Sequence, residues 1–403
     1  MEEKDVIRLY ETSERLVRGV SMRHRRYLCN KINWDNRLIC IKGAKGTGKT
    51  TLVLQHMRET FGPGNIRALF VSLDNIWFAA HDLIDLVDWH WKRGGTHIFL
   101  DEVHHLRSWQ TVVKTIYDSY PELNIVYTGS SMLQLEAGNG DLSRRRIPYV
   151  LAGLSFREYL LFEAVGDFPA IGLDEILTNH GVLVREVLAQ TRVLEHFAAY
   201  LKTGFYPFYK EGRDEFPVRL QEIVNHILEN DYPAIEDVSV ATTLKAKKML
   251  MVLAESVPQT PKMAQLYREL ETDRNQGLKI LRALSRAGLL QLLSSEKISL
   301  KDMSRPDKIY LDNTSLMHTL VRDVDTGTKR ETFFLNQLRN AGHDVTYPPV
   351  GDFLVDGKYL FEVGGSGKGF DQIKDIPDSF VAADDIETGF GNKIPLWLFG
   401  FLY

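Results

Sequence analysis

Residues 38–50 read LICIKGAKGTGKT, an apolar run that passes directly into a glycine-rich loop. Gly43 to Thr50 match the pattern G-x-x-x-x-G-K-[ST] of phosphate-binding loops. The apolar run predicts a buried strand, and the residues from about Thr50 predict an amphipathic helix. Glycines leave backbone N–H groups free to face a phosphate chain, and a helix N-terminus adds the positive end of its dipole. The sequence therefore predicts a strand, loop and helix that bind phosphates.

Two residues of this loop have specific predicted roles. Lys49 would reach the β- and γ-phosphates of a nucleotide, and the Thr50 hydroxyl would ligate Mg²⁺. The predicted cofactors are therefore ATP and Mg²⁺, with ATP and ADP as bound nucleotides. The predicted nucleotide-binding set comprises Gly43, Ala44, Lys45, Gly46, Thr47, Gly48, Lys49, Thr50 and Thr51.

Two acidic residues end a later apolar run. Residues 66–73 predict a second strand, and residues 96–102, which read THIFLDE, predict a third. Asp101 at the end of such a strand would hold Mg²⁺ together with Thr50, and Glu102 would polarise the attacking water. A strand that merely reaches the surface would look the same, but the intact loop upstream makes this the minority interpretation.

A fourth predicted strand, residues 124–127, is followed by three hydroxyl residues. Thr128, Ser130 and Ser131 could contact the γ-phosphate or position water there, so they are candidate sensors of the nucleotide. For each residue singly, an ordinary strand-ending turn explains the sequence nearly as well.

An arginine run, residues 144–146, precedes a fifth predicted strand at residues 149–151. Arginines at this position could act as fingers that neutralise charge on the phosphates of a neighbouring subunit, which would require a homo-oligomer. A solvated charge run explains them equally well.

Composition sets limits on the other classes of function. The 403 residues are 44% hydrophobic and 25% charged, with a formal net charge of -4, which argues against wholesale nucleic-acid wrapping. Cys29 and Cys40 form neither a disulfide framework nor a metal-binding spacing. We find no signal-peptide core and no run of about eighteen apolar residues. The expectation is a cytoplasmic protein without a membrane partner.

Four segments together resemble a family of bacterial and archaeal AAA+-like ATPases. They read GAKGTGKT (43–50), HIFLDEVHHLRSW (97–109), YTGSS (127–131) and LSRRR with LAGLSFREYL (142–160). The resemblance covers nearly the whole chain and implies ATP binding and hydrolysis. It also implies that Ser130 is the sensor and that Arg144 or Arg145 is the finger. In this family a winged helix and a nuclease-like region follow the ATPase domain.

The middle of the chain has two patterns. Residues 160–232 have helical periodicity and suggest a lid over the nucleotide. Residues 263–270 and 274–287 then predict two short helices with Asp273 as a cap, and residues 289–293 and 308–311 predict two strands. Helix, turn, helix and two-stranded wing is the order of a winged helix.

The predicted winged helix carries a local excess of positive charge. Residues 241–300 contain ten basic and five acidic residues, which suits contacts with the phosphates of double-stranded DNA. A winged helix that contacts proteins would explain the same sequence equally well. The basic residues considered are Lys262, Arg268, Arg274, Lys279, Arg282 and Arg286.

The C-terminal segment resembles the nuclease fold with the signature D…(D/E)-x-K. We predict a helix over 331–340, strands at 343–347 and 359–363, and a strand ending at Asp352. Asp352 and Glu362, with Glu331 on the helix, would hold a divalent metal. The signature lysine is replaced by Gly364, although Lys368 or Lys374 could supply it. The site is therefore predicted to be vestigial and the domain inactive.

The expected architecture is α/β: a P-loop NTPase parallel sheet with a helical lid, a winged helix and a small α/β nuclease-like domain. The leading function is an Mg²⁺-dependent ATPase, with Lys49, Glu102, Ser130, Arg144 and Arg145 as catalytic residues. The alternatives are a nucleotide-dependent switch or scaffold with slow turnover, or an ATP-gated, metal-dependent DNA nuclease. The predicted domains are residues 1–159 (ATPase with an N-terminal helix), 160–235 (lid), 236–325 (winged helix) and 326–403 (nuclease-like).

Overall fold

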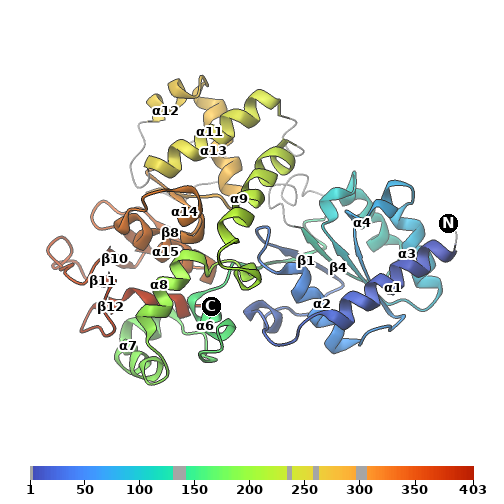
Figure 1. Cartoon of the computed structure of the whole chain (residues 1–403), viewed down its shortest axis with the longest axis horizontal. Coiled ribbons are helices and arrows are strands. Elements are labelled where there is room, and N and C mark those ends of the chain that lie inside the picture. Colours follow the sequence, from blue (N-terminus) through green and yellow to red (C-terminus); the bar gives the residue numbers. More distant parts are fainter. Residues whose placement is uncertain (1–2, 130–141, 234–237, 257–262, 296–305) are drawn as a thin grey trace. The chain divides into compact units, whose positions relative to one another are not determined.

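The computed structural model describes residues 3–129, 142–233, 238–256, 263–295 and 306–403. The chain forms two compact units, Met1–Gly153 and Leu154–Tyr403, which Figure 1 shows from blue to cyan and from green to red. The finer division into four domains stays a prediction. In the described part of the chain, no helix is long and apolar enough to cross a membrane.

A five-stranded parallel sheet forms the centre of the first unit. The strand order is β2-β3-β4-β1-β5, and every neighbouring pair is parallel. All five predicted strands are therefore confirmed, and so is the α/β class of this part. The strands are β1 (Leu38–Lys42), β2 (Ala68–Ser72), β3 (His97–Asp101), β4 (Asn124–Gly129) and β5 (Ile147–Val150).

Helices cover both faces of this sheet because successive strand side chains point to opposite sides. Ile39 and Ile41 pack in one apolar cluster with Leu52 of α2, whereas Leu38 and Cys40 pack in a second cluster with residues of α3 and α4. Figure 1 shows these helices around the sheet. The helices of this unit are α1 (Glu3–Gly19), α2 (Lys49–Thr60), α3 (Leu83–Lys92) and α4 (Trp109–Ser119).

The second unit begins with helices, as the periodicity of residues 160–232 predicts. These helices are α6 (Phe156–Phe162), α7 (Leu173–Leu188), α8 (Val193–Thr203) and α9 (Phe216–His226). Short helical turns complete the two units: η1 (Tyr27–Asn30), η2 (Ile76–Ala79), η3 (Val103–His105), η4 (Pro207–Glu211), the π-turn η5 (Ile227–Asp231) and η6 (Leu396–Phe401).

The predicted helix, turn, helix and hairpin follow in the expected order. Helix α12 precedes a turn at which the Asp273 carboxylate accepts hydrogen bonds from the N–H groups of Asn275 and Gln276, so Asp273 caps α13. Strands β6 and β7 pair antiparallel. The elements are α11 (Val240–Ser256), α12 (Met263–Glu269), α13 (Arg274–Arg286), β6 (Leu290–Leu293) and β7 (Lys308–Leu311).

A second five-stranded sheet, ordered β12-β11-β10-β9-β8, forms the C-terminal part. The predicted strand ending at Asp352 is wrong: β9 begins after this residue, because Pro348-Pro349 and the turn at Gly351 (φ +86°) interrupt the strand. The elements are α14 (Thr314–Leu320), α15 (Thr326–Ala341), β8 (Val345–Thr346), β9 (Phe353–Val355), β10 (Tyr359–Gly364), β11 (Ser379–Ala383) and β12 (Lys393–Pro395).

Candidate functional site

The glycine-rich loop joins β1 to α2 at the carboxyl edge of the parallel sheet. Gly46 and Gly48 have φ angles of +86° and +92°, a conformation that strains other residues. Among the described residues, no side chain caps the first turn of α2. The buried Lys49 side chain folds back onto the loop, and Nζ donates to the carbonyl oxygens of Gly43 (3.0 Å) and Ala44 (3.1 Å). Both the loop and the uncapped helix start suit a bound phosphate.

Asp101, at the end of β3, accepts hydrogen bonds from two threonines. Thr50 at the start of α2 donates to Oδ2 over 2.7 Å, and Thr128 in β4 donates to Oδ1. Burial raises the pKa of Asp101, which is 4% exposed, while the Thr128 bond acts in the opposite direction. We call Thr50, Asp101 and Thr128 the aspartate site. It brings together residues 78 positions apart in sequence because β3 and β4 are neighbours in the sheet.

Glu102 lies directly beside the aspartate site. Its backbone has φ +51°, and its N–H donates to Thr128 Oγ1 over 3.3 Å. The carboxylate lies 3.2 Å from His104 Nδ1. Burial lowers the pKa of His104 to about 4, although Glu102 acts against this shift. A strained backbone that places a partly exposed carboxylate beside the loop is typical of a functional position.

The remaining predicted residues of this site have different outcomes. Ser130 and Ser131 lie outside the described residues, so their sensor role stays a prediction. Arg144 is exposed, and Arg145 forms an ion pair with Asp118 over 3.1 Å. The finger role of both arginines therefore also stays a prediction.

The oxygen atoms of the aspartate site suit a hard divalent cation. Mg²⁺ prefers carboxylate and hydroxyl oxygens and keeps several waters, and Thr50 and Asp101 present such oxygens 2.7 Å apart. The role of Thr128 in holding Asp101 follows from the strand order, which the sequence motif alone does not give. Its only sequence signal is a hydroxyl residue at the end of an apolar run.

The second unit contains a group of alternating charges. Lys308 Nζ lies 3.2 Å from Glu331 Oε2 and 3.6 Å from Asp352 Oδ1, and Lys368 pairs with Glu362. We call these five residues the carboxylate–lysine cluster. Across the described residues, no group of three or more His, Cys, Asp or Glu side chains is placed to hold a metal ion. The vestigial metal site thus stays a prediction.

Lys368 occupies the space of the missing signature lysine. A Cβ atom built on Gly364 would lie 2.7 Å from both Cβ and Cγ of Lys368, so the Lys368 side chain fills the position that a side chain at 364 would take. Glu362 is 2% exposed, and its Oε1 atom has no hydrogen-bond partner among the described groups. Burial raises the pKa of Glu362, and Lys368 acts in the opposite direction.

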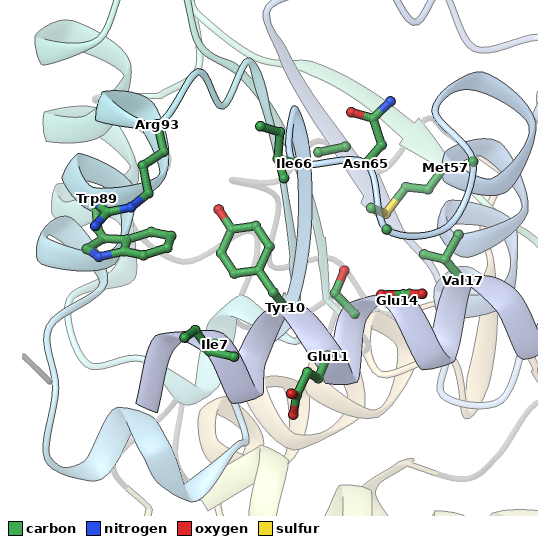
Figure 2. A pocket seen from close by; sticks show the side chains of 14 residues that line it. Ile7, Tyr10, Glu11, Glu14, Val17, Met57, Asn65, Ile66, Trp89 and Arg93 are labelled. Atoms are coloured by element: carbon green, nitrogen blue, oxygen red, sulfur yellow. The ribbon is translucent and has the colours of Figure 1, made fainter. Parts of the chain in front are cut away.

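The first unit also contains an apolar cavity of about 490 Å³ away from the loop. Figure 2 shows it between α1, the loop before β2, and α3, with Tyr10, Trp89, Ile66 and Met57 in its wall. The polar groups around it already have partners: the Tyr10 hydroxyl contacts His90 Nδ1, and Arg93 lies over the Trp89 ring at 3.7 Å. None of the predicted site residues lines it.

The fold and loop of the first unit are those of a P-loop nucleotide-binding domain. Residues 35–160 match the family model of the AAA domain, and residues 194–328 match a model described as a domain of unknown function (DUF8612). An uncharacterized protein of Methanocaldococcus jannaschii is 27% identical over 90% of this chain and 82% of its own length.

Three solved structures have weak similarity to the chain. The Aeropyrum pernix ORC1 protein in complex with DNA is 13% identical, with a TM-score of 0.31, over 80% of this chain and 92% of its own. AMPPCP-bound DnaA from Aquifex aeolicus is 17% identical, with a TM-score of 0.25, over 71% and 89%. PCH-2 of C. elegans is 19% identical, with a TM-score of 0.24, over 40% of this chain and under half (46%) of its own length. Scores this low carry no weight for function.

Proposed function

We propose that the first unit binds ATP with Mg²⁺ and hydrolyses it. The observation that carries this proposal is the convergence of Thr50 and Thr128 on Asp101 beside the glycine-rich loop. The match of residues 35–160 to the AAA domain also favours a nucleotide-binding ATPase.

The proposed chemistry is the attack of water on the γ-phosphorus, with cleavage of the β–γ bond to give ADP and phosphate. Lys49 leaves the carbonyl groups of Gly43 and Ala44 and binds phosphate oxygens, which neutralises charge in the transition state. Glu102 orients the water and accepts its proton. Thr50 and Asp101 would hold Mg²⁺, which supplies positive charge to the phosphate oxygens when bound.

Steady-state ATP turnover by the full chain tests this proposal. Glu102→Gln should bind ATP normally and lose at least about 100-fold in turnover, as is usual when a general base is removed. Glu122→Gln changes an exposed glutamate of the same unit and should turn over normally. Wild-type turnover by Glu102→Gln would refute the assigned base. A wild-type rate near zero, with and without duplex DNA, would support the switch or scaffold instead.

We further propose that the ATPase is coupled to double-stranded DNA through α13. Arg274 and Lys279 are exposed on this helix, whereas Ile280 and Leu281 are buried. A polar hollow of about 540 Å³ is lined by Lys279 together with Asp273, Asn275 and Gln276. Lys262 lies outside the described residues. An exposed basic face next to polar side chains suits phosphate contacts along a duplex.

The carboxylate–lysine cluster supports a second candidate function, metal-dependent cleavage of DNA. The observation that favours it is the Lys368 side chain in the space above Gly364. Glu331, Asp352 and Glu362 are not placed to hold a metal as folded, so this candidate requires them to rearrange around a metal, for which the Oε1 atom of the buried Glu362, without a hydrogen-bond partner, would be one ligand. Lys368 would steady the attacking water or the leaving group.

Incubation of the purified protein with several DNA forms and Mg²⁺ or Mn²⁺ tests this candidate. Cleavage by the wild type should be lost in both Glu362→Ala and Lys368→Ala, and retained in Lys374→Ala. Cleavage that survives Glu362→Ala comes from a contaminant. Cleavage that is lost in Lys374→Ala but retained in Lys368→Ala would assign the lysine role to the other residue.

A further inference from the structure

Arg26 is a buried residue whose guanidinium group donates hydrogen bonds to three main-chain oxygens. The residue is 4% exposed and lies just before η1, well upstream of the glycine-rich loop. Its Nη1 donates to the carbonyl oxygen of Thr47, and its Nη2 donates to those of Ala152 (2.7 Å) and Gly153 (2.9 Å). One rigid guanidinium therefore joins the phosphate loop to the last residues of the first unit.

The bond to Thr47 fixes the direction of a peptide group in the loop. In a planar trans peptide the C=O and the following N–H point in opposite directions. Because the Thr47 carbonyl points to Arg26, the N–H of Gly48 points away from it, at the turn where α2 begins. Backbone N–H groups at this turn are those that bind phosphate. Arg26 thus orients a phosphate-binding donor without contacting phosphate itself.

The other acceptors of Arg26 lie where the two units join in sequence. Gly153 ends the first unit and Leu154 begins the second. Within the second unit, Leu154 N–H donates to Phe205 O over 2.7 Å, and the Tyr200 hydroxyl donates to Leu154 O over 2.8 Å. The consecutive residues Gly153 and Leu154 are therefore each hydrogen-bonded within their own unit.

Two further contacts hold the segment before this junction, the first to η1 and the second to the loop. The hydroxyl of Tyr27 donates to Val150 O over 3.2 Å. A Cβ atom on Gly43 would lie only 2.4 Å from Leu151 O, so any side chain at position 43 would push this segment away. The loop and residues 150–153 are thus packed backbone to backbone, and close-packed groups transmit small displacements.

We propose that Arg26 is a positioning residue that transmits occupancy of the phosphate loop to residues 152–153, and so to the start of the second unit. The proposal rests on the proposed nucleotide binding and adds its regulation. When phosphate draws the Gly48 N–H inward, the Thr47 carbonyl moves with it. The planar guanidinium group then keeps its hydrogen bonds to Thr47, Ala152 and Gly153 only if Ala152 and Gly153 move too.

Hydrogen exchange of the full chain, with and without the non-hydrolysable analogue AMPPCP and Mg²⁺, tests the proposal. In the wild type, nucleotide should change the exchange rate of peptides covering residues 147–156 at least about threefold. Arg26→Met should bind nucleotide within tenfold of the wild type but show the same exchange rate with and without it. A merely structural role would raise both rates equally and leave their ratio unchanged.

Arg26→Lys serves as the second variant because it keeps the positive charge and removes the planar guanidinium group with its several N–H donors. At saturating nucleotide it should lose most of the exchange ratio, with weaker nucleotide binding than the wild type, whereas Arg23→Lys, on an exposed position outside these contacts, should keep the wild-type ratio. A wild-type ratio in Arg26→Lys overturns the proposal, and so does an unchanged rate in nucleotide-bound wild type. No nucleotide binding by the wild type overturns the proposed function and this inference together.

Discussion

The aspartate site and the carboxylate–lysine cluster both contain largely buried acids, but different groups hold these acids. Thr50 and Thr128 donate neutral hydrogen bonds to Asp101. In the cluster, ammonium groups neutralise the acids: Lys308 contacts Glu331 and Asp352, and Lys368 contacts Glu362.

This difference affects how easily each group of acids can bind a metal ion. A divalent cation can approach Asp101 without displacing a charged partner, because hydroxyl groups can turn and become ligands themselves. In the cluster, a metal must compete with two lysines that already supply the positive charge. The first region therefore suits the metal and nucleotide that we propose for it. In the second, ion pairs with two lysines already hold the three acids, and a metal there would have to move Lys308 or Lys368 aside.

The largest expected effect concerns the glycine-rich loop beside the aspartate site. Lys49→Ala should lower ATP affinity about a thousandfold, because two charge-assisted phosphate contacts of about 2 kcal/mol each are lost. Isothermal titration with ATP and Mg²⁺ measures this loss. Lys92→Ala, at the end of α3 and paired with Asp88, is the matched control and should bind like the wild type. Normal affinity in Lys49→Ala would mean that the loop does not hold the phosphates.

Acid should act on the first unit through buried histidines. His90 is fully buried, with contacts from Nδ1 to the Tyr10 hydroxyl and from Nε2 to the His97 carbonyl. The neutral ring can accept from Tyr10 and donate to His97, so a second proton would break one contact. Burial lowers the pKa of His90 to about 4. The unfolded chain therefore binds more protons between pH 6.5 and 4, and stability falls as pH falls through this window.

The expected loss is about 3 kcal/mol over this window, from about 1.4 kcal/mol per pKa unit. Urea unfolding followed by tryptophan fluorescence reports it, because five of the six tryptophans belong to the first unit. His90→Gln should reduce the dependence of stability on pH. Part of this dependence should remain in the variant, because burial also lowers the pKa of His56 to about 4. An unchanged pH dependence in His90→Gln would show that this ring does not titrate as described.

The contrast between the two regions also explains what the sequence could predict. The loop, Lys49 and Asp101 were predictable because their spacing along the chain is the motif itself, and an apolar run before each fixes a strand. The partnership of Thr128 with Asp101 depends on β3 and β4 being neighbours, which no local pattern states. Arg26 has still less signal in the sequence, since its contacts with Thr47, Ala152 and Gly153 are made to backbone carbonyl groups of two distant segments.

The carboxylate–lysine cluster was harder to predict because its lysine comes from a different sequence position than the one that the signature gives. The signature places its lysine two residues after Glu362, and Gly364 stands there. The absence of a side chain at 364 is what lets Lys368 enter the same space. The predicted strand before Asp352 failed for a local reason, since prolines and a positive-φ glycine break the extended chain.

A smaller effect is expected at the cluster. Lys368→Met leaves the buried Glu362 without its counter-charge, which should destabilise the second unit by about 2 kcal/mol, less than for a fully buried pair because Lys368 is partly exposed. Adding Glu362→Gln should restore most of the loss. Urea unfolding followed by far-ultraviolet circular dichroism measures both variants. A double variant as unstable as Lys368→Met would show that the ion pair does not account for the loss.

The response of Lys368→Met to Mn²⁺ tests whether lysine and metal compete for the acids of the cluster. Removal of the ammonium frees carboxylate oxygens, so Mn²⁺ should raise the melting temperature of Lys368→Met more than that of the wild type. Equal responses would mean that lysine and metal do not compete at this cluster, and the two regions would then differ less than their hydrogen bonds indicate.

The smallest expected effect concerns the proposed binding of double-stranded DNA. Lys279 is exposed on α13 beside the polar hollow, so Lys279→Ala should weaken duplex binding severalfold and uniformly across DNA sequences. It should also reduce the slope of log affinity against log salt by about one. Fluorescence anisotropy with a labelled duplex at several salt concentrations measures both quantities, and Lys202→Ala on α8 is the control. An unchanged slope in Lys279→Ala would exclude this side chain from the phosphate contacts. The proposed coupling to DNA through α13 would then lose its main support.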